Sequence, residues 1–287
     1  MTLPEFVTLD TVLPALQAWR DGPKTARMNL NTLILRAGAE IMRIYATDFA
    51  VAAKGDASPV TEADQRAEAI ILAGLREIAP DIPVVAEEEA AAGRIPAIDG
   101  KFFLVDPLDG TKEFISKNGE FTVNIALIDH GEPVLGAVYA PALGQLYWGG
   151  PDGAFMADIK DGFPGLARPI GVRAAPAAGV TAVGSRSHGG AETEAYLRAF
   201  RVAAFEPAGS SLKFCLVARG DADLYPRMGR TMEWDTAAGD AILRAAGGRV
   251  ETLDGRPLAY GKRNRTDDAD FANPHFVAFG DPALART

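Results

Sequence analysis

The chain has 287 residues, of which 48% are hydrophobic, so it is long enough to bury a sizeable core in one or two domains. Its 38 acidic and 29 basic residues give a formal net charge of −9, which argues against nonspecific nucleic-acid binding because that requires a basic surface. The single cysteine, Cys215, excludes an internal disulfide and suits a reducing compartment. Its neighbours are apolar, so we expect a buried core thiol rather than a nucleophile.

The N-terminal part has no pattern typical of a targeting or membrane segment. No apolar run approaches the roughly 20 residues that cross a bilayer, and the first ten residues lack the basic start and apolar stretch of a secretory signal. Residues 1–27 have weak periodicity and three helix breakers, so we interpret them as an N-terminal extension. We therefore expect a cytoplasmic protein.

Two amphipathic helices are predicted after this extension. Apolar residues at helical spacing over 29–45 indicate the first. After a loop at 54–59, the run Thr61-Glu62-Ala63-Asp64 fits a capping box that begins the second, which Pro80 ends. By this local pattern alone, Asp64 is a structural residue.

The remaining elements change character along the chain. Short strands are predicted first, at 84–86, 102–105, 122–128, 134–139 and 145–148. The spacing of the later strands favours an antiparallel sheet. The weakly patterned, Gly- and Pro-rich stretch 151–178 is predicted to be a domain junction. Beyond it, strands at 180–184, 202–205, 222–225 and 275–279 alternate with helices at 191–200, 211–219 and 235–246. We predict an α/β fold, with an α+β domain at 28–165 and an α/β domain at 166–287.

The run Asp106-Pro107-Leu108-Asp109-Gly110-Thr111 carries the strongest chemical pattern. It ends an apolar segment with two carboxylates across a proline turn, and the Leu108 carbonyl between them is a third oxygen of the kind that Mg²⁺ prefers. Gly110 and Thr111 follow where a helix can begin, so their backbone N–H groups suit an anion such as phosphate. The alternative is ordinary turn chemistry, because Asp-Gly is common in turns.

Two further acidic sites lie at the ends of apolar elements. Glu87-Glu88-Glu89 directly follows the strand pattern at 84–86, and Asp235 lies in Glu233-Trp234-Asp235-Thr236 before an apolar helix. Each has a structural alternative, since acids favour the first turn of a helix and Asp is a common N-cap.

Taken together, these segments resemble the inositol monophosphatase superfamily of Mg²⁺-dependent, Li⁺-sensitive phosphatases, whose fold is a layered αβαβα sugar-phosphatase-like arrangement. The matching motifs are Glu87-Glu88, Asp106 to Thr111 and Trp234 to Gly239. Within the superfamily, the chain is most similar to the CysQ branch of 3′(2′),5′-bisphosphate nucleotidases, on segments 106–114, 118–127 and 209–215. The resemblance covers about residues 29–280 and departs from the usual pattern at Glu89 and Glu233.

The resemblance implies roles for particular residues. It makes Glu87, Asp106, Asp109 and Asp235 metal-binding carboxylates, with the Leu108 carbonyl completing a site for two or three Mg²⁺ ions. By the same resemblance, Asp64 and Thr111 orient or deprotonate the attacking water with Glu88 close behind, and the identity of the base stays open. The implied substrate contacts are Gly110, Thr111, His188, Ser211, Lys213, Arg227 and Asp235.

The implied activity is hydrolysis of adenosine 3′,5′-bisphosphate (PAP) to AMP and phosphate, with inhibition by Li⁺, in sulfur-assimilation housekeeping. The partner is then a small nucleotide bisphosphate. One alternative is an inositol-monophosphatase-like enzyme for a sugar or cyclitol phosphate, which would not need the cations Lys213 and Arg227. Another is a noncatalytic nucleotide-binding protein. Some bacterial relatives associate peripherally with the inner face of the membrane, although this sequence has no membrane-binding helix pattern; it leaves the oligomeric state open.

Overall fold

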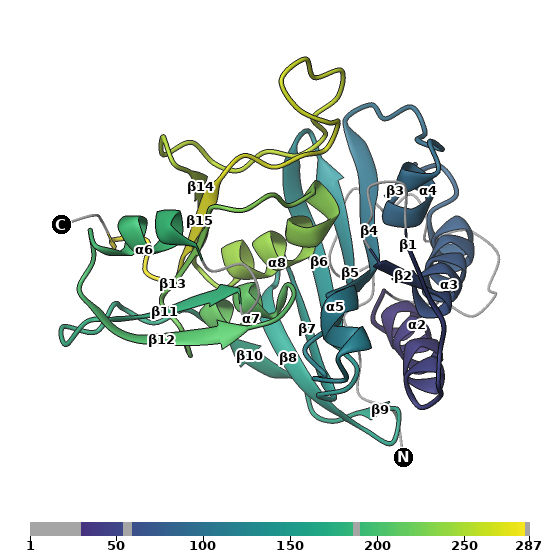
Figure 1. The fold of residues 1–287 in the computed structure, drawn as a ribbon, viewed down its shortest axis with the longest axis horizontal. Helices are drawn as coiled ribbons and strands as arrows, with labels where there is room; N and C mark the ends of the chain where they lie inside the picture. The colour runs from purple at the N-terminus through teal and green to yellow at the C-terminus, as the bar shows by residue number, and fades with distance from the viewer. Residues whose placement is uncertain (1–29, 54–58, 186–189, 285–287) are drawn as a thin grey trace.

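The computed structural model describes residues 30–53, 59–185 and 190–284, so the predicted N-terminal extension and most of the 54–59 loop lie outside the described residues. The described elements form five layers (Figure 1). Helices α2 (Leu30–Tyr45) and α3 (Glu62–Ile78) cover one face of a first sheet, and α7 (Leu212–Ala218) and α8 (Glu233–Ala245) separate it from a second sheet. Helix α6 (Ala191–Leu197) lies outside that sheet. The predicted αβαβα arrangement is confirmed.

The first sheet has eight strands and is antiparallel except where β3 runs parallel to β4. Its order is β10-β8-β7-β6-β5-β4-β3, and β9 pairs with β8. The strands are β3 (Val84–Ala86), β4 (Lys101–Asp109), β5 (Thr122–Asp129), β6 (Glu132–Ala140), β7 (Gln145–Gly150), β8 (Gly153–Lys160), β9 (Phe163–Pro164) and β10 (Arg168–Ile170). A separate hairpin pairs β1 (Val51–Ala53) with β2 (Pro59–Thr61).

No strand was predicted within the weakly patterned stretch 151–178, but β8, β9 and β10 lie in it. A two-residue connection, Pro151-Asp152, joins β7 to β8 as a hairpin, and β8 buries Ala154, Met156 and Ala157. Small residues and glycines hide this strand pattern, because they fit against the neighbouring layer without a run of large apolar side chains. The first sheet therefore extends to Ile170, and the division into two domains stays a prediction.

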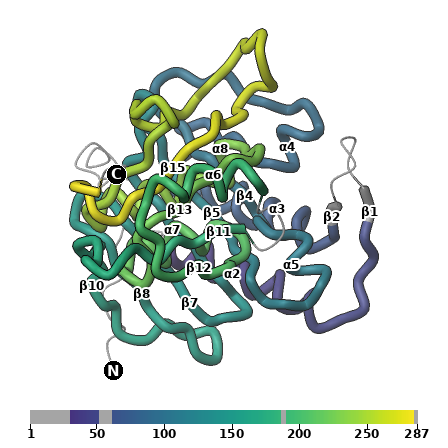
Figure 2. Tube along the Cα trace, turned by 60° about the vertical axis from the view of Figure 1, so that its left-hand side comes forward, coloured from purple at the N-terminus to yellow at the C-terminus, as the bar shows by residue number. Residues whose placement is uncertain are grey.

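The second sheet is mixed, with the order β12-β11-β13-β15-β14 (Figure 1), and Figure 2 shows β11, β12, β13 and β15 from another side. Its first three strands are parallel, as the predicted α/β alternation requires, whereas β15 is antiparallel to both neighbours. The strands are β11 (Val180–Ser185), β12 (Val202–Ala208), β13 (Leu224–Arg227), β14 (Arg249–Thr252) and β15 (Phe276–Phe279). The sequence analysis missed β1, β2 and β14, whereas the short helices α4 (Glu87–Ala91) and α5 (Thr111–Ile115) begin at the two places where it noted that a helix can start.

Small residues let α8 pack closely between its neighbours. A Cβ atom on Gly136 of β6 would lie 2.2 Å from the Ala238 carbonyl oxygen of α8, and one on Gly239 would lie 2.6 Å from the Phe214 ring of α7. The Ala-Ala-Gly part of the Trp234–Gly239 motif is therefore a packing requirement. It places the first turn of α8 beside the first sheet.

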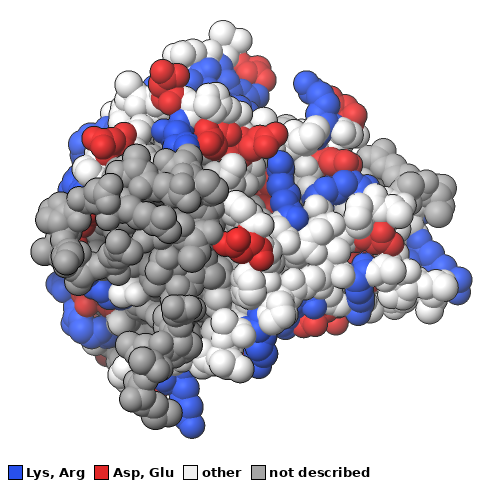
Figure 3. Space-filling view, turned by 180° about the vertical axis from the view of Figure 1, so that it is seen from behind, with Lys and Arg blue, Asp and Glu red and all other residues white. Residues whose placement is uncertain are grey.

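Charge on the described surface is paired locally. Figure 3 shows acidic and basic side chains interspersed on the rear face, and ion pairs join Arg94 to Glu89 and Lys101 to Asp129. Among the described residues, no helix is long and apolar enough to span a bilayer. Cys215 is buried, as predicted.

We expect Gly136→Ala to lower the free energy of unfolding by about 2 kcal/mol, because its methyl group must displace α8 from the sheet. Urea unfolding measures the loss. Gly171→Ala is the matched control, since its Cβ would meet only the Ala246 carbonyl at an ordinary 3.7 Å. Equal stabilities for the two variants would contradict this account of α8 packing.

Candidate active site

A cavity of about 300 Å³ lies where β4, α5, α7 and the first turn of α8 meet. Residues of both sheets line it, so neither sheet alone makes the site. The predicted site residues in its wall are Glu87, Asp106, Leu108, Asp109, Gly110, Thr111, Ser211, Lys213, Arg227 and Asp235. Among the other predicted residues, Asp64 and Glu88 lie behind this wall, and His188 lies outside the described residues.

A β-bulge brings Asp106 and Asp109 to the same cavity. Residues three apart in a regular strand point to opposite faces. Here Asp106 pairs with Asn124 and Asp109 with Thr122, so β4 has one residue more than β5 across this interval. Pro107 is tolerated in an interior strand because it lies in the bulge. The predicted proline turn is therefore an irregularity inside β4, and it turns both aspartates and Leu108 toward the cavity.

Asp64 caps α3, as the local pattern predicts, and it also contacts Thr111 in the cavity wall, whereas its role toward the attacking water stays a prediction. Its Oδ2 accepts the Thr61 N–H at 2.8 Å and the Thr61 hydroxyl at 2.7 Å, which completes the predicted capping box of α3. Its Oδ1 accepts the Thr111 hydroxyl at 3.3 Å, and that hydroxyl also lies 3.4 Å from the Leu108 carbonyl oxygen. The cap thus fixes the carboxylate that holds Thr111.

Asp235 likewise caps its own helix. Its Oδ2 accepts the N–H of Met232 at 2.8 Å. Asn273 supports the same turn, since its Nδ2 donates to the Met232 carbonyl at 2.7 Å and the Thr236 hydroxyl at 3.0 Å. Asn273, which lies just before β15, therefore holds the first turn of α8 at the cavity. The sequence analysis gave no indication of this contact.

The carboxyl groups in the cavity resist ionisation. Burial raises the pKa of Asp106 well above its usual range, and the charges of Glu87, Asp109 and Asp235 raise it further. Burial and the same neighbours raise the pKa of Asp235, and burial raises that of Asp109. Uncompensated charges in this cluster repel one another, so it favours bound protons or cations.

The donor set is rich in oxygen, as hard cations require, but it is engaged within the protein. Asp106 accepts the Leu108 N–H at 3.0 Å, and Asp109 accepts the Ser210 hydroxyl at 2.7 Å. Within the described ranges, no three acidic, histidine or cysteine side chains already surround a single ion position.

Two cations also line the cavity, where Lys213 interacts electrostatically with Asp109 and Arg227 with Asp235. Lys213 is buried and donates to the carbonyl oxygens of Ala208, at 3.2 Å, and Ser210. Burial lowers its pKa to about 8, although Asp109 opposes the shift. Arg227 donates through Nη2 to the Arg230 carbonyl at 3.1 Å, whereas its buried Nε has no hydrogen-bond partner among the described residues.

Sequence reasoning missed Ser210 as a site residue. It has a left-handed backbone (φ 52°), and its hydroxyl joins Asp109 to the hydroxyl of Thr122 in β5. Its position inside the Gly209-Ser210-Ser211 motif was the available indication. Ser211 is turned inward, with its hydroxyl 2.6 Å from the Asn124 side-chain oxygen.

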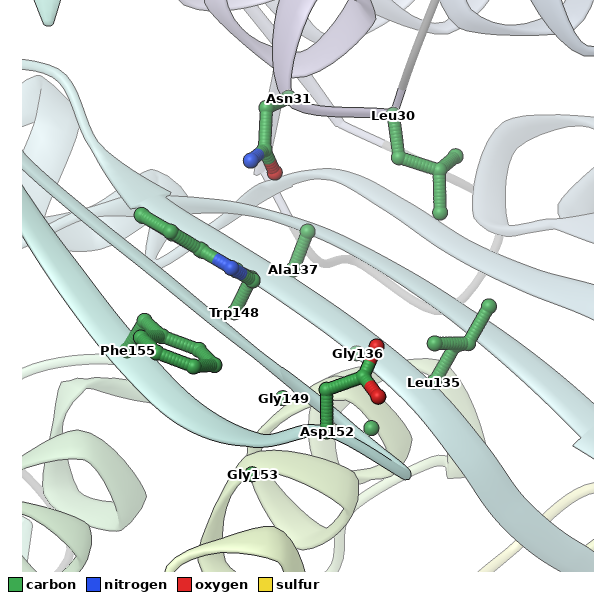
Figure 4. Close-up of a pocket in the computed structure, with 11 residues that line it drawn as sticks. Leu30, Asn31, Leu135, Gly136, Ala137, Trp148, Gly149, Asp152, Gly153 and Phe155 are labelled. Carbon is green, nitrogen blue, oxygen red and sulfur yellow. The ribbon is translucent and has the colours of Figure 1, made fainter. Parts of the chain in front are cut away.

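A second pocket is too small to compete with this site. It lies between the start of α2 and strands β6 to β8, where Asn31 faces the indole of Trp148 (Figure 4). Its cavity is about 30 Å³, which is the space of a water or two rather than of a metabolite. The chemistry is therefore assigned to the larger cavity.

We expect Asp106→Asn to stabilise the protein in EDTA at pH 8. A carboxyl group whose pKa is raised by folding contributes stability below its unfolded pKa of about 4, and that contribution is lost as the pH rises through the folded pKa. Asparagine keeps the acceptor for Leu108 N–H without the charge, so the variant is expected to be more stable than the natural chain at pH 8, and the difference fades toward pH 4. Urea unfolding across this pH range tests it.

The matched control is Asp152→Asn, a substitution of an exposed aspartate, which is expected to leave stability within about 0.5 kcal/mol at either pH. An Asp106→Asn protein less stable than the natural chain at pH 8 would show that the cluster carries no net repulsion.

Comparisons with known proteins agree with this site. The inositol monophosphatase family model matches residues 25–272. The 3′(2′),5′-bisphosphate nucleotidase CysQ of Escherichia coli O157:H7 is 47% identical over 246 residues, which cover 85% of this chain and 95% of that protein. The crystal structure of CysQ from Bacteroides thetaiotaomicron is 37% identical with a TM-score of 0.69, covering 86% of this chain and 94% of its own. The IMPase of Thermotoga maritima is 25% identical with a TM-score of 0.66, covering 86% and 89%. The chain therefore belongs to the inositol monophosphatase family.

Proposed function

We propose that this protein is a Mg²⁺-dependent, Li⁺-inhibited 3′(2′),5′-bisphosphate nucleotidase of the cytoplasm, which hydrolyses PAP to AMP and phosphate. The observation that carries the proposal is a single cavity lined both by clustered carboxylates and by two cations, the buried Lys213 and the partly exposed Arg227. A substrate with two separated phosphates suits this division of charge. The 47% identity to a protein named 3′(2′),5′-bisphosphate nucleotidase supports the same substrate class.

The metal-binding residues of the proposal are Glu87, Asp106, Asp109 and Asp235, with the Leu108 carbonyl. All provide oxygen, and the raised pKa values of the three aspartates reflect a negative charge that two or three Mg²⁺ ions would neutralise. Such ions, when bound, lower the pKa of a coordinated water and offset charge on the phosphoryl group.

Asp64 and Thr111 hold the attacking water in this proposal. The Thr111 hydroxyl lies between Asp64 Oδ1 and the Leu108 carbonyl, and Asp64 cannot swing away because Oδ2 caps α3. Glu88 lies behind the neighbouring Glu87. A fixed acceptor beside the water directs its lone pair toward phosphorus for in-line attack.

Gly110 and Thr111 contact the phosphate that is transferred. Gly110 has a left-handed backbone (φ 89°), and the N–H groups at this start of α5 have no side-chain cap. They are available to phosphate oxygens where charge develops.

The second phosphate is contacted by Arg227 in this proposal. The unpaired, buried Nε of Arg227 is an available donor, whereas Lys213 already holds the 208–210 turn through two carbonyl oxygens. Lys213 then contributes charge and fixes that turn, and the neighbouring Ser211 packs it against β5. Specificity for a bisphosphate therefore depends first on Arg227.

We expect PAP to be the best substrate in a panel with inositol 1-phosphate and fructose 1,6-bisphosphate, each assayed with Mg²⁺ by phosphate release. EDTA is expected to abolish release, and Asp109→Asn to lower kcat at least about a hundredfold because a ligand carboxylate is lost. A higher kcat/KM for inositol 1-phosphate than for PAP would overturn the substrate assignment and favour the cyclitol phosphatase.

We expect Arg227→Ala to raise KM for PAP about tenfold or more and to change KM for a monophosphate by less than about twofold, because only PAP loses a charged hydrogen bond. Lys213→Ala is expected to impair both substrates, since the 208–210 turn also positions Ser210 against Asp109. Steady-state kinetics distinguish the two variants. Arg256→Ala, which removes an exposed arginine paired with Asp254, is the control. Equal effects of Arg227→Ala on both substrates would show that Arg227 does not contact the second phosphate.

A further inference from the structure

Helix α4 carries two residues of the proposed site but has no cap of its own. It begins at Glu87 after Ala86, whose methyl group cannot accept a hydrogen bond, so the first N–H groups of the helix need acceptors from elsewhere. Three consecutive glutamates occupy this first turn. The orientation of Glu87 and Glu88 therefore depends on whatever holds these N–H groups.

Glu68 of α3 provides the missing acceptors. Its Oε2 accepts the N–H of Glu88 at 2.7 Å, and its Oε1 accepts the N–H of Glu89 at 3.0 Å. The side chain is only 3% exposed, so water does not compete for either oxygen. Two bonds to consecutive N–H groups fix both the distance and the rotation of α4 relative to α3.

The same face of α3 carries Asp64 one helical turn earlier, because residues four apart lie above one another on a helix. Both side chains are buried. Asp64 reaches Thr111 while Glu68 reaches α4, so one rigid helix sets the spacing between the two parts of the catalytic wall.

Burying the Glu68 carboxylate lowers the stability of the fold, so we expect this side chain to have a specific role. Burial raises its pKa to about 7, and the charges of Glu88 and Glu89 add to the shift although their N–H groups oppose it. Glutamine would relieve this cost, but its amide has only one acceptor oxygen and would turn an NH₂ group toward the second N–H. Only a carboxylate satisfies both donors.

We propose that Glu68 is a positioning residue of this enzyme, which clamps the first turn of α4 so that Glu87 and Glu88 face the Asp64–Thr111 pair. The effect of Glu68 on catalysis rests on the proposed function. The contact between Glu68 and α4 is a property of the fold, and it can be measured without an activity assay.

The test compares Glu68→Gln with Glu77→Gln, an exposed glutamate on the same helix as the matched control. In EDTA, Glu68→Gln is expected to speed hydrogen exchange in a peptide spanning 84–94 by about tenfold, because one of the two protected amides loses its acceptor and faces an NH₂ group instead. The Mg²⁺ concentration that gives half of the ion-dependent rise in Tm is expected to increase about tenfold, as for residues that orient metal ligands. Glu68→Gln should fold, since it removes a buried charge.

With PAP, kcat of Glu68→Gln is expected to fall about tenfold or more while KM changes by less than about twofold, because α4 does not contact the second phosphate. Unchanged exchange in 84–94 would overturn the clamp. Faster exchange with an unchanged Mg²⁺ response and kcat would overturn the positioning role. If the natural chain does not hydrolyse PAP, the proposed function fails, whereas the exchange and Tm measurements still decide the clamp.

Discussion

Repulsion among buried carboxylates is the constraint on which the arrangement of this site depends. Asp106, Asp109 and Asp235 lie in one cavity with Glu87, and burial together with like charge raises the pKa of each aspartate. Such a cluster is unfavourable for folding unless a proton or cation compensates it. The surrounding structure therefore has to supply the free energy that keeps these groups together.

Backbone irregularity and capping provide much of this support. The bulge in β4 directs two aspartates to one face, and Asp64 and Asp235 are each fixed by the N–H groups of the turn that they cap. Capping satisfies helix donors and immobilises the carboxylate in one step. Asp64 and Asp235, which the local sequence pattern assigns to helix starts, therefore also contact or line the cavity of the proposed site.

Positive charge in the cavity comes from Lys213 of α7 and Arg227 of β13. Lys213 is committed to the turn that presents Ser210 to Asp109, whereas Arg227 keeps a buried donor available. Because the aspartates of β4 and Arg227 of β13 belong to different sheets, the packing of the two sheets sets the separation of groups that a ligand can bridge. This separation gives a physical basis for selecting a bisphosphate, and it is fixed by α8, which packs between the sheets at Gly136.

The sequence by itself determined helices α2 and α3, most strands and the chemical character of the metal and phosphate segment. Helical periodicity, the capping box of α3 and the Asp106–Thr111 run are patterns of neighbouring residues, so they can be identified without the tertiary structure. Its motifs also indicated the family, which the comparisons confirm. Only the tertiary structure decided that β8 continues the first sheet, that Lys213 is engaged by carbonyl groups, and that Glu68 holds α4. The Glu68 contacts join residues 20 and 21 apart in the sequence, and β8 and Lys213 are set by packing against a neighbouring layer, so none of these features leaves a pattern along the chain.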